Sequence, residues 1–172
     1  MVHRQLWGQH VVSKPPDFSD RVLSADQVAQ NDKYRNAGMV WDALAAEVKA
    51  GYKAWGKRLN KPPYALFNKN FSRPPSVEEI DLSQYAGQAG QTIGIRAVDL
   101  FEVAAVEVTV REAGGNVVEK GAAVKNPGEK YKWAYQTTVA AQNPVGLTVE
   151  AMAKNWPGKQ GNRVQLLTSP GT

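Results

Sequence analysis

The chain of 172 residues has no cysteine and only two histidines, His3 and His10. Without cysteine there is no disulfide, no thiolate zinc site and no cysteine nucleophile. The two histidines lie seven residues apart in a segment that soon reaches Pro15-Pro16, and this spacing matches no metal-ligand motif. Neither histidine has a serine or an acid placed nearby as in a catalytic triad. We therefore expect no bound metal, no cofactor and no enzymatic activity.

Motifs for nucleotide or acyl-transfer chemistry are also missing, since neither Gly-Lys-Ser/Thr nor Gly-x-Ser-x-Gly occurs. The clustered carboxylates Glu78, Glu79 and Asp81 could be taken for a glycosidase-like pair, but neighbouring residues of a strand point to opposite faces. A capping or solvated role is favoured for them. No apolar run approaches the roughly 18 residues of a membrane span, and residues 1–7 lack the apolar run of a signal peptide. We therefore expect a cytoplasmic or virion-associated location and no membrane partner.

Acidic residues are absent from one long stretch of the chain. Residues 1–77 hold twelve Lys/Arg against six Asp/Glu, and residues 78–172 hold nine against ten. Between Val48 and Val77 there is no acid, and seven bases are present: Lys49, Lys53, Lys57, Arg58, Lys61, Lys69 and Arg73. Lys49, Lys53 and Lys57 recur every four residues, so a helix would place them in one row. A solvated face is the plain interpretation, and a contact surface for nucleic acid or an acidic protein is the alternative.

Apolar residues recur at steps of three and four over residues 34–59, as on one face of a helix: Tyr34, Ala37, Trp41, Leu44, Val48, Tyr52, Trp55 and Leu59. The pattern predicts one long helix from a capping box at Ser24 and Gln27, or two helices end to end with a break near Gly51. A continuous helix would be about 50 Å long, and we expect the chain to be too small to cover all of its apolar face. The pattern therefore predicts that a partner covers the rest of this face.

Proline pairs delimit the rest of the front half. Pro62-Pro63 predicts a second, short helix whose Tyr64, Phe67 and Phe71 pack back on Trp55 and Leu59 as an αα-hairpin, which completes a helical region over residues 24–73. Residues 1–23 are expected as an extended arm that docks on its own helix or on a neighbouring subunit, with a short edge strand over residues 9–13. Residues 74–91, after Pro74-Pro75, are expected as a linker.

From Thr92 onward the apolar periodicity changes to two. Six short strands separated by turns predict an antiparallel immunoglobulin-like β-sandwich over residues 92–168, and hence an α+β fold class. The last of these strands contains Val164 and Leu166. Tyr131, Trp133 and Tyr135 share one face of a strand, where a core role is favoured over a sugar-binding face. Trp156 is expected in a turn, exposed at an interface.

Two segments resemble known proteins. The β half resembles bacterial immunoglobulin-like or fibronectin type III-like modules in Ile95-Arg96-Ala97-Val98-Asp99, in residues 106–111, in the turn Gly114-Gly115-Asn116 and in residues 131–135 and 147–153. The helical half is similar to uncharacterised proteins of bacteria and their phages or prophages in Ser24-Ala25-Asp26-Gln27, Trp41, Gly51-Tyr52, Trp55 and residues 63–70. The resemblance implies a structural or adhesive part, such as a virion component, and no reaction.

These features lead to three hypotheses. The first is a non-enzymatic structural protein that forms a homo-oligomer or assembles with other structural subunits, with interface residues Trp7, Trp41, Trp55 and Trp156. The alternative is a binding module that takes polyanions on Lys49, Lys53, Lys57 and Arg58, or carbohydrate on the β-sandwich. An enzyme with an unrecognised site is the least favoured.

Overall fold

The computed structural model describes residues 2–6, 9–14, 22–144 and 146–168, and the chain divides into two compact units, residues 1–36 and 37–172. In the first unit, β1 (Val2–Leu6) and β2 (Gln9–Ser13) form an antiparallel hairpin. The expected strand over residues 9–13 is therefore confirmed, and it pairs with a strand that the sequence pattern did not predict. Trp7 and Pro15-Pro16 of the expected arm lie outside the described residues.

Helix α1 (Ala25–Ala43) begins at the expected capping box. The Ser24 backbone N–H donates to Gln27 Oε1 at 3.1 Å, and the Gln27 backbone N–H donates to Ser24 Oγ at 3.3 Å. Two N–H groups of the first turn, which have no partner within a helix, are satisfied in this way. Residues 25–36 are exposed, and burial along α1 starts at Ala37.

The prediction of one continuous helix is wrong, since α1 is followed by a separate helix α2 (Ala46–Leu59). The break lies at Leu44 and Ala45, not near Gly51, and Ala45 is extended at φ −58° and ψ 149°. Lys49 Nζ donates to the Asp42 carbonyl at 2.9 Å, which satisfies one of the last carbonyls of α1. This corner brings the Trp41 ring to 5.9 Å from the Tyr52 ring, so the apolar stripe folds onto itself.

Helix α3 (Pro63–Phe71) starts with proline at its first position, as expected, after α2 ends at Asn60 in the left-handed conformation. It covers the apolar flank of α1 and α2: the Phe67 ring lies 5.1 Å from Trp41 and 5.7 Å from Tyr52. Leu59, expected in this contact, is 44% exposed. The helices therefore bury most of the stripe from Ala37 to Trp55 within the second unit, which removes much of the physical reason to expect a partner there.

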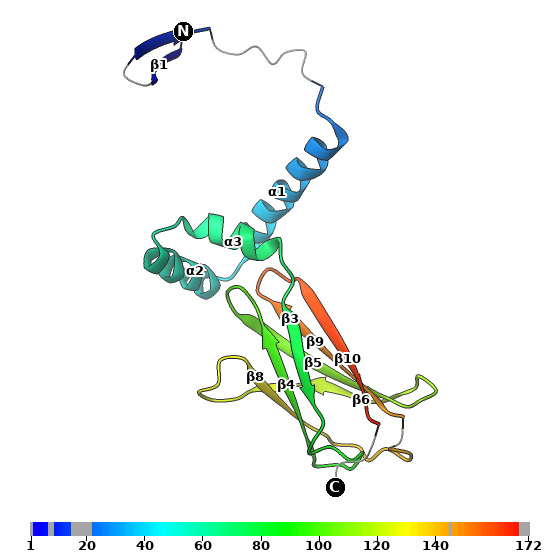
Figure 1. Ribbon diagram of the computed structural model, residues 1–172. Helices are drawn as coiled ribbons and strands as arrows, with labels where there is room; N and C mark the ends of the chain where they lie inside the picture. The colour runs from blue at the N-terminus through cyan, green and yellow to red at the C-terminus, as the bar shows by residue number, and fades with distance from the viewer. Residues whose placement is uncertain (1, 7–8, 15–21, 145, 169–172) are drawn as a thin grey trace. The chain divides into compact units, whose positions relative to one another are not determined.

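The rest of the second unit is a sandwich of two four-stranded antiparallel sheets (Figure 1). One sheet has the order β3-β4-β8-β7, formed by β3 (Ser76–Asp81), β4 (Thr92–Val98), β8 (Lys132–Gln136) and β7 (Val124–Lys125). The other has the order β10-β9-β5-β6, formed by β10 (Gln160–Leu166), β9 (Thr148–Asn155), β5 (Val103–Arg111) and β6 (Val117–Ala122). In chain order this is the strand arrangement of an immunoglobulin-type sandwich. The α+β class with an antiparallel sandwich is confirmed.

Strand β3 lies inside the segment expected as a linker, and that expectation is wrong for residues 76–81. Its buried residues, Val77 and Ile80, are three apart because the pairing with β4 shifts register between Val77 and Glu79. A β-bulge of this kind inserts one residue and breaks the alternation of two that sequence patterns rely on.

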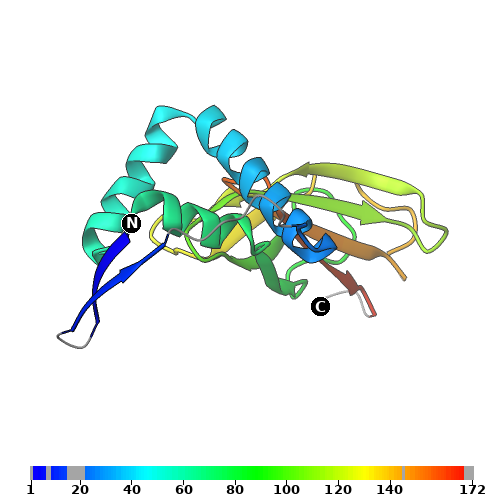
Figure 2. The same cartoon turned by 90° about the horizontal axis from the view of Figure 1, so that it is seen from above.

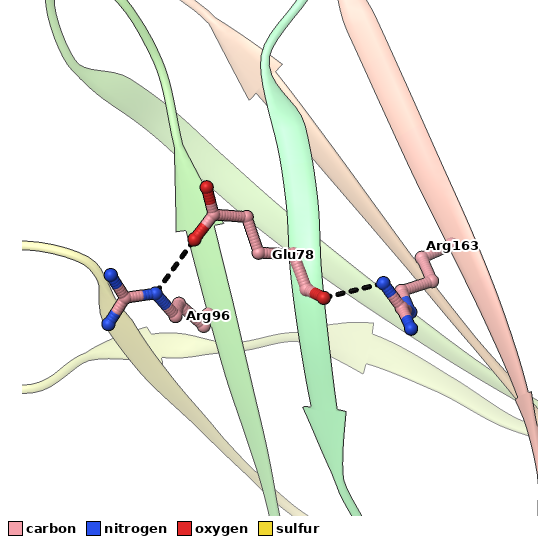
Figure 3. A network of polar contacts seen from close by, with 3 residues as sticks. All are labelled: Glu78, Arg96 and Arg163. Atoms are coloured by element: carbon pink, nitrogen blue, oxygen red, sulfur yellow. Dashed lines mark hydrogen bonds and ion pairs between the residues drawn. The ribbon is translucent and has the colours of Figure 1, made fainter.

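Arg163 joins the two sheets where their edges meet. Val164 and Leu166 of β10 are 56% and 48% exposed, and the residue that enters the core is Leu167. Figure 3 shows Arg163 of β10 reaching β3, where its Nη1 donates to the Glu78 carbonyl at 2.5 Å. The Glu78 carboxylate in turn pairs with Arg96 Nε of β4 at 2.8 Å. Charged residues on edge strands of this kind oppose pairing with another sheet.

Candidate functional site

A buried network of polar side chains fixes the helices to one end of the sandwich. The Tyr52 hydroxyl donates a hydrogen bond to Asn70 Oδ1, and Asn70 Nδ2 donates a hydrogen bond to Asp99 Oδ2 at 2.6 Å. Asn155, in the last position of β9, donates to Asp99 Oδ1 at 3.2 Å and to the Arg73 carbonyl at 3.2 Å. Asn70 and Asn155 are fully buried, so each bond replaces water that these groups lose on folding. Figure 1 and Figure 2 show α2 and α3 at this end of the sandwich.

The Tyr52 hydroxyl is held in its protonated state. Burial raises the pKa of Tyr52 well above its usual range, and the negative charge of Asp99 raises it further. Tyr52 therefore remains a hydrogen-bond donor at every ordinary pH.

Phe101, in the loop between β4 and β5, fixes that loop against α2. Its ring stacks on Tyr52 at 4.3 Å and on Trp55 at 5.0 Å between centroids. Glycine at position 51 permits this close contact, because a Cβ there would lie 3.1 Å from Phe101 Cζ and the ring would have to shift by a few tenths of an ångström. The helix thus approaches the loop closely at Gly51.

A pocket of about 330 Å³ lies beside this contact. We call it the junction pocket. Its lining comes from α2, from the β4–β5 loop, from β5 and β7, and from the β7–β8 loop: Trp55, Arg58, Asp99, Leu100, Phe101, Glu102, Val103, Lys125, Lys130 and Tyr131. The volume is at the lower end of the range for ligand pockets, about 300 to 1,000 Å³. The junction pocket can hold one small group.

The charges at the junction pocket are not balanced. Lys125 Nζ pairs with Glu102 Oε1 at 2.6 Å, and the Asp99 carboxylate is occupied by amide donors. Arg58 and Lys130 have no acidic partner among the described residues. Lys130 Nζ lies 5.1 Å from the centre of the Tyr131 ring, which is 36% exposed. The same pocket is therefore lined by two cations without ion pairs, one of which, Lys130, lies over the partly exposed ring of Tyr131.

The basic row predicted on α2 is divided by the structure. Lys49 is engaged with the Asp42 carbonyl, whereas Lys53 and Lys57 are exposed one turn apart. Arg58 is rotated by about 100° from Lys57 around the helix axis, because each residue advances a helix by that angle, and it lines the junction pocket. The four residues are therefore not one patch. In the described part of the chain, none of the seven bases between Val48 and Val77 forms an ion pair.

A second pocket, of about 420 Å³, lies on the β3-β4-β8 sheet, and its lining includes Gly94 and Ala134. Its basic residues are already neutralised: Arg96 pairs with Glu78, and Lys132 pairs with Glu129 at 2.6 Å. The expected core role is confirmed for Trp133 and Tyr135, which are 7% and 6% exposed. It is wrong for Tyr131, which precedes β8 and is 36% exposed. This pocket therefore lacks both the unpaired cations and the exposed aromatic rings of the junction pocket.

The predicted interface tryptophans lie in different surroundings. Trp41 packs among the rings of the helices, including Tyr64 at 5.7 Å, and Trp55 lines the junction pocket. Trp156 is 40% exposed in the turn between β9 and β10, where the sequence pattern placed it. Trp7 lies outside the described residues. Their role as interface residues stays a prediction.

The hairpin of the first unit brings the two histidines together, with ring centroids 5.3 Å apart. The sequence pattern did not predict this contact between the histidines, because it did not predict β1. The β1–β2 pairing places both histidines on one face of the hairpin. Within the described ranges no cluster of three or more His, Cys, Asp or Glu could hold a metal ion. No helix in those ranges is long and apolar enough to cross a bilayer.

Comparisons with known proteins give little beyond the fold. No family model matches the chain, and no curated protein matches it, so nothing supports the resemblance of the helical half to phage proteins. The chain is similar to the crystal structure of CopC from Methylosinus trichosporium OB3b, with a TM-score of 0.38, 15% identity, and coverage of 55% of this chain and 93% of that one. It is also similar to a tetra-tandem repeat in the extending region of a large adhesion protein, with a TM-score of 0.37 and 19% identity over 57% of this chain and 24% of that one. These similarities carry no functional argument.

Proposed function

We propose that the chain is a non-enzymatic binding module for polyanions, which it takes on the helical part of its second unit. One observation carries the proposal: seven Lys/Arg and no acid fall between Val48 and Val77, and none of the seven is ion-paired in the described part of the chain. Cations that are not neutralised within the protein attract phosphate or sulfate groups and release the counterions of the polymer.

The exposed cations Lys53, Lys57 and Arg58 supply the test. The triple variant K53Q/K57Q/R58Q and a control variant K154Q/K120Q/R111Q lose the same charge. The control residues lie on strands of the β10-β9-β5-β6 sheet and not on α2. Binding to a fluorescent single-stranded oligonucleotide is measured by anisotropy over a series of salt concentrations. We expect the helix variant to bind more weakly and its salt slope to fall by about 2, at about 0.7 for each lost contact. An equal loss in both variants would show that only net charge matters and would contradict the proposal.

A second candidate is the structural role, in which the chain assembles with itself or with a larger lattice. Exposed apolar residues on the β9–β10 hairpin favour it: Trp156, Val164 and Leu166 are 40%, 56% and 48% exposed. Membership of a phage virion rests on the sequence resemblance alone. Size-exclusion chromatography with light scattering tests assembly, which predicts an oligomer at micromolar concentration that W156S or deletion of residues 1–23 reduces to monomer. A monomer in all three proteins would rule this candidate out.

A further inference from the structure

The junction pocket combines two features that a general polyanion site does not need. It has two cations without acidic partners, Arg58 and Lys130, and it has aromatic surface from Trp55, Phe101 and Tyr131. A sulfated polysaccharide would use the cations, but its sugar rings have no flat aromatic face to stack on the rings of the pocket. A nucleotide carries both a phosphate and a flat aromatic base, so it complements both features.

We infer that the junction pocket seats one base of a single-stranded nucleic acid, with neighbouring phosphates on Arg58 and Lys130. This inference rests on the proposed polyanion binding and names the class of polyanion. The base stacks on a face of the Tyr131 ring, where it takes the place of Lys130 Nζ, 5.1 Å from the ring centre, or of the Arg96 guanidinium, 5.8 Å from it. The pocket volume of about 330 Å³ admits a base and excludes a duplex, whose bases are paired and stacked inside the helix.

The pocket is held in shape before any ligand binds. Phe101 is fixed between Tyr52 and Trp55 by stacking, and its backbone N–H donates to Asp99 Oδ2 at 3.0 Å. Asp99 is fixed in turn by Asn70 and Asn155. A pocket wall that is already ordered loses little conformational entropy when a base enters the pocket, which favours affinity.

Cations outside the pocket extend the surface. Lys53 and Lys57 are exposed on the same helix as Arg58 and have no partner in the described part of the chain. A strand with one base in the pocket has further phosphates within reach of such side chains, whereas a mononucleotide does not. The inference therefore predicts that an oligonucleotide binds more tightly than a mononucleotide.

The experiment compares three ligands on the full chain by anisotropy or competition: oligothymidylate, an abasic oligonucleotide of the same length, and heparin. The variant Tyr131→Leu removes the aromatic ring and keeps apolar volume, and Tyr131→Trp restores an aromatic ring. The matched control is Tyr34→Leu, which removes a 54% exposed tyrosine from α1. Thermal unfolding of each variant shows that it is folded.

We expect Tyr131→Leu to weaken oligothymidylate binding at least about fivefold, since one stacked base contributes about 1 to 3 kcal/mol. Tyr131→Trp should restore binding, Tyr34→Leu should leave it unchanged, and heparin or abasic binding should not respond to Tyr131→Leu. Equal affinity for oligothymidylate and the abasic strand, with no effect of Tyr131→Leu, would overturn the inference and leave polyanion binding intact. Thymidine monophosphate that binds as tightly as the oligomer would also overturn it. If none of the polyanions binds, the proposed function itself fails.

Discussion

Asp99 accepts a hydrogen bond from the side-chain amide of Asn70 at 2.6 Å, which ties the loop after β4 to helix α3. The same carboxylate accepts from the Phe101 backbone N–H and from Asn155 on β9. One side chain thus joins a helix, a strand and the loop that carries Phe101. The geometry of the junction pocket depends on this point.

Replacing Asp99 by alanine should therefore destabilise the second unit. The change removes the acceptor of the buried Asn70 amide and of the Phe101 backbone N–H, and it leaves Asn155 with the Arg73 carbonyl alone. A buried donor left unsatisfied costs about 1 to 3 kcal/mol. We expect Asp99→Ala to lower the free energy of unfolding by about 3 kcal/mol in urea denaturation. Asp81→Ala, which removes an exposed carboxylate bonded to the Ser83 N–H, should lower it by less than about 1 kcal/mol. Equal effects of the two variants would show that the Asp99 network contributes nothing specific.

Two glycines in helices should respond differently to alanine. A Cβ at Gly38 would meet Tyr64 Oη at an ordinary 3.6 Å, so Gly38→Ala should stabilise the protein by about 0.5 to 1 kcal/mol through helix propensity. A Cβ at Gly51 would lie 3.1 Å from Phe101 Cζ, and the displaced ring should cancel that gain. Thermal unfolding of both variants measures the difference. A stabilised Gly51→Ala protein would mean that Phe101 does not need this close approach.

The capping box at the start of α1 should act locally. Ser24→Ala removes the acceptor for the Gln27 backbone N–H and should cost about 1 kcal/mol of local helix stability. Amide hydrogen exchange should then become faster in residues 25–29, and the unfolding temperature of the second unit should not change. Unchanged exchange in the first turn would argue that the cap is not formed in solution.

Stability should fall at alkaline pH because of buried tyrosines. Burial raises the pKa of Tyr135 from its ordinary value of 10.0 to about 12, and its hydrogen bond to the nearby carboxylate of Glu119 adds to this effect. A group whose folded pKa is raised binds its proton more tightly in the folded state, so its contribution is complete below pH 10 and is lost as pH rises toward 12. Urea denaturation should show a loss that starts above about pH 10 and is smaller in Tyr135→Phe. An equal loss in both proteins would assign the effect to other groups.

Local patterns were enough to predict much of the fold. The capping box at Ser24, the proline at the start of α3 and the alternation in β4 and β5 each act within a few residues of sequence, and the structure has them as expected. Strand β3 was missed because a bulge breaks its alternation. The corner at Leu44 and Ala45 was missed because neither residue is a helix breaker and long-range packing on α3 determines the turn.

The candidate site was only partly predictable. Sequence alone indicated the basic stretch and singled out Trp55 and Arg58, because both depend on composition and spacing along one helix. It could not indicate Asp99, Phe101 or Lys130, since these residues come from two loops, β4–β5 and β7–β8, that meet α2 only in the folded unit. A lone aromatic residue three positions after a strand, such as Phe101, carries no periodic signal.

The central claim is that a polyanion binds at the junction pocket and on the basic surface around it. Its most direct test is an NMR titration of the full chain with oligothymidylate at low salt, which follows the backbone amide signals. We predict that the largest shifts fall on α2, on residues 99–103 and on residues 130–131, and that added salt reverses them. Shifts confined to the β10-β9-β5-β6 sheet or to the β1–β2 hairpin, or no shifts at all, would contradict this account.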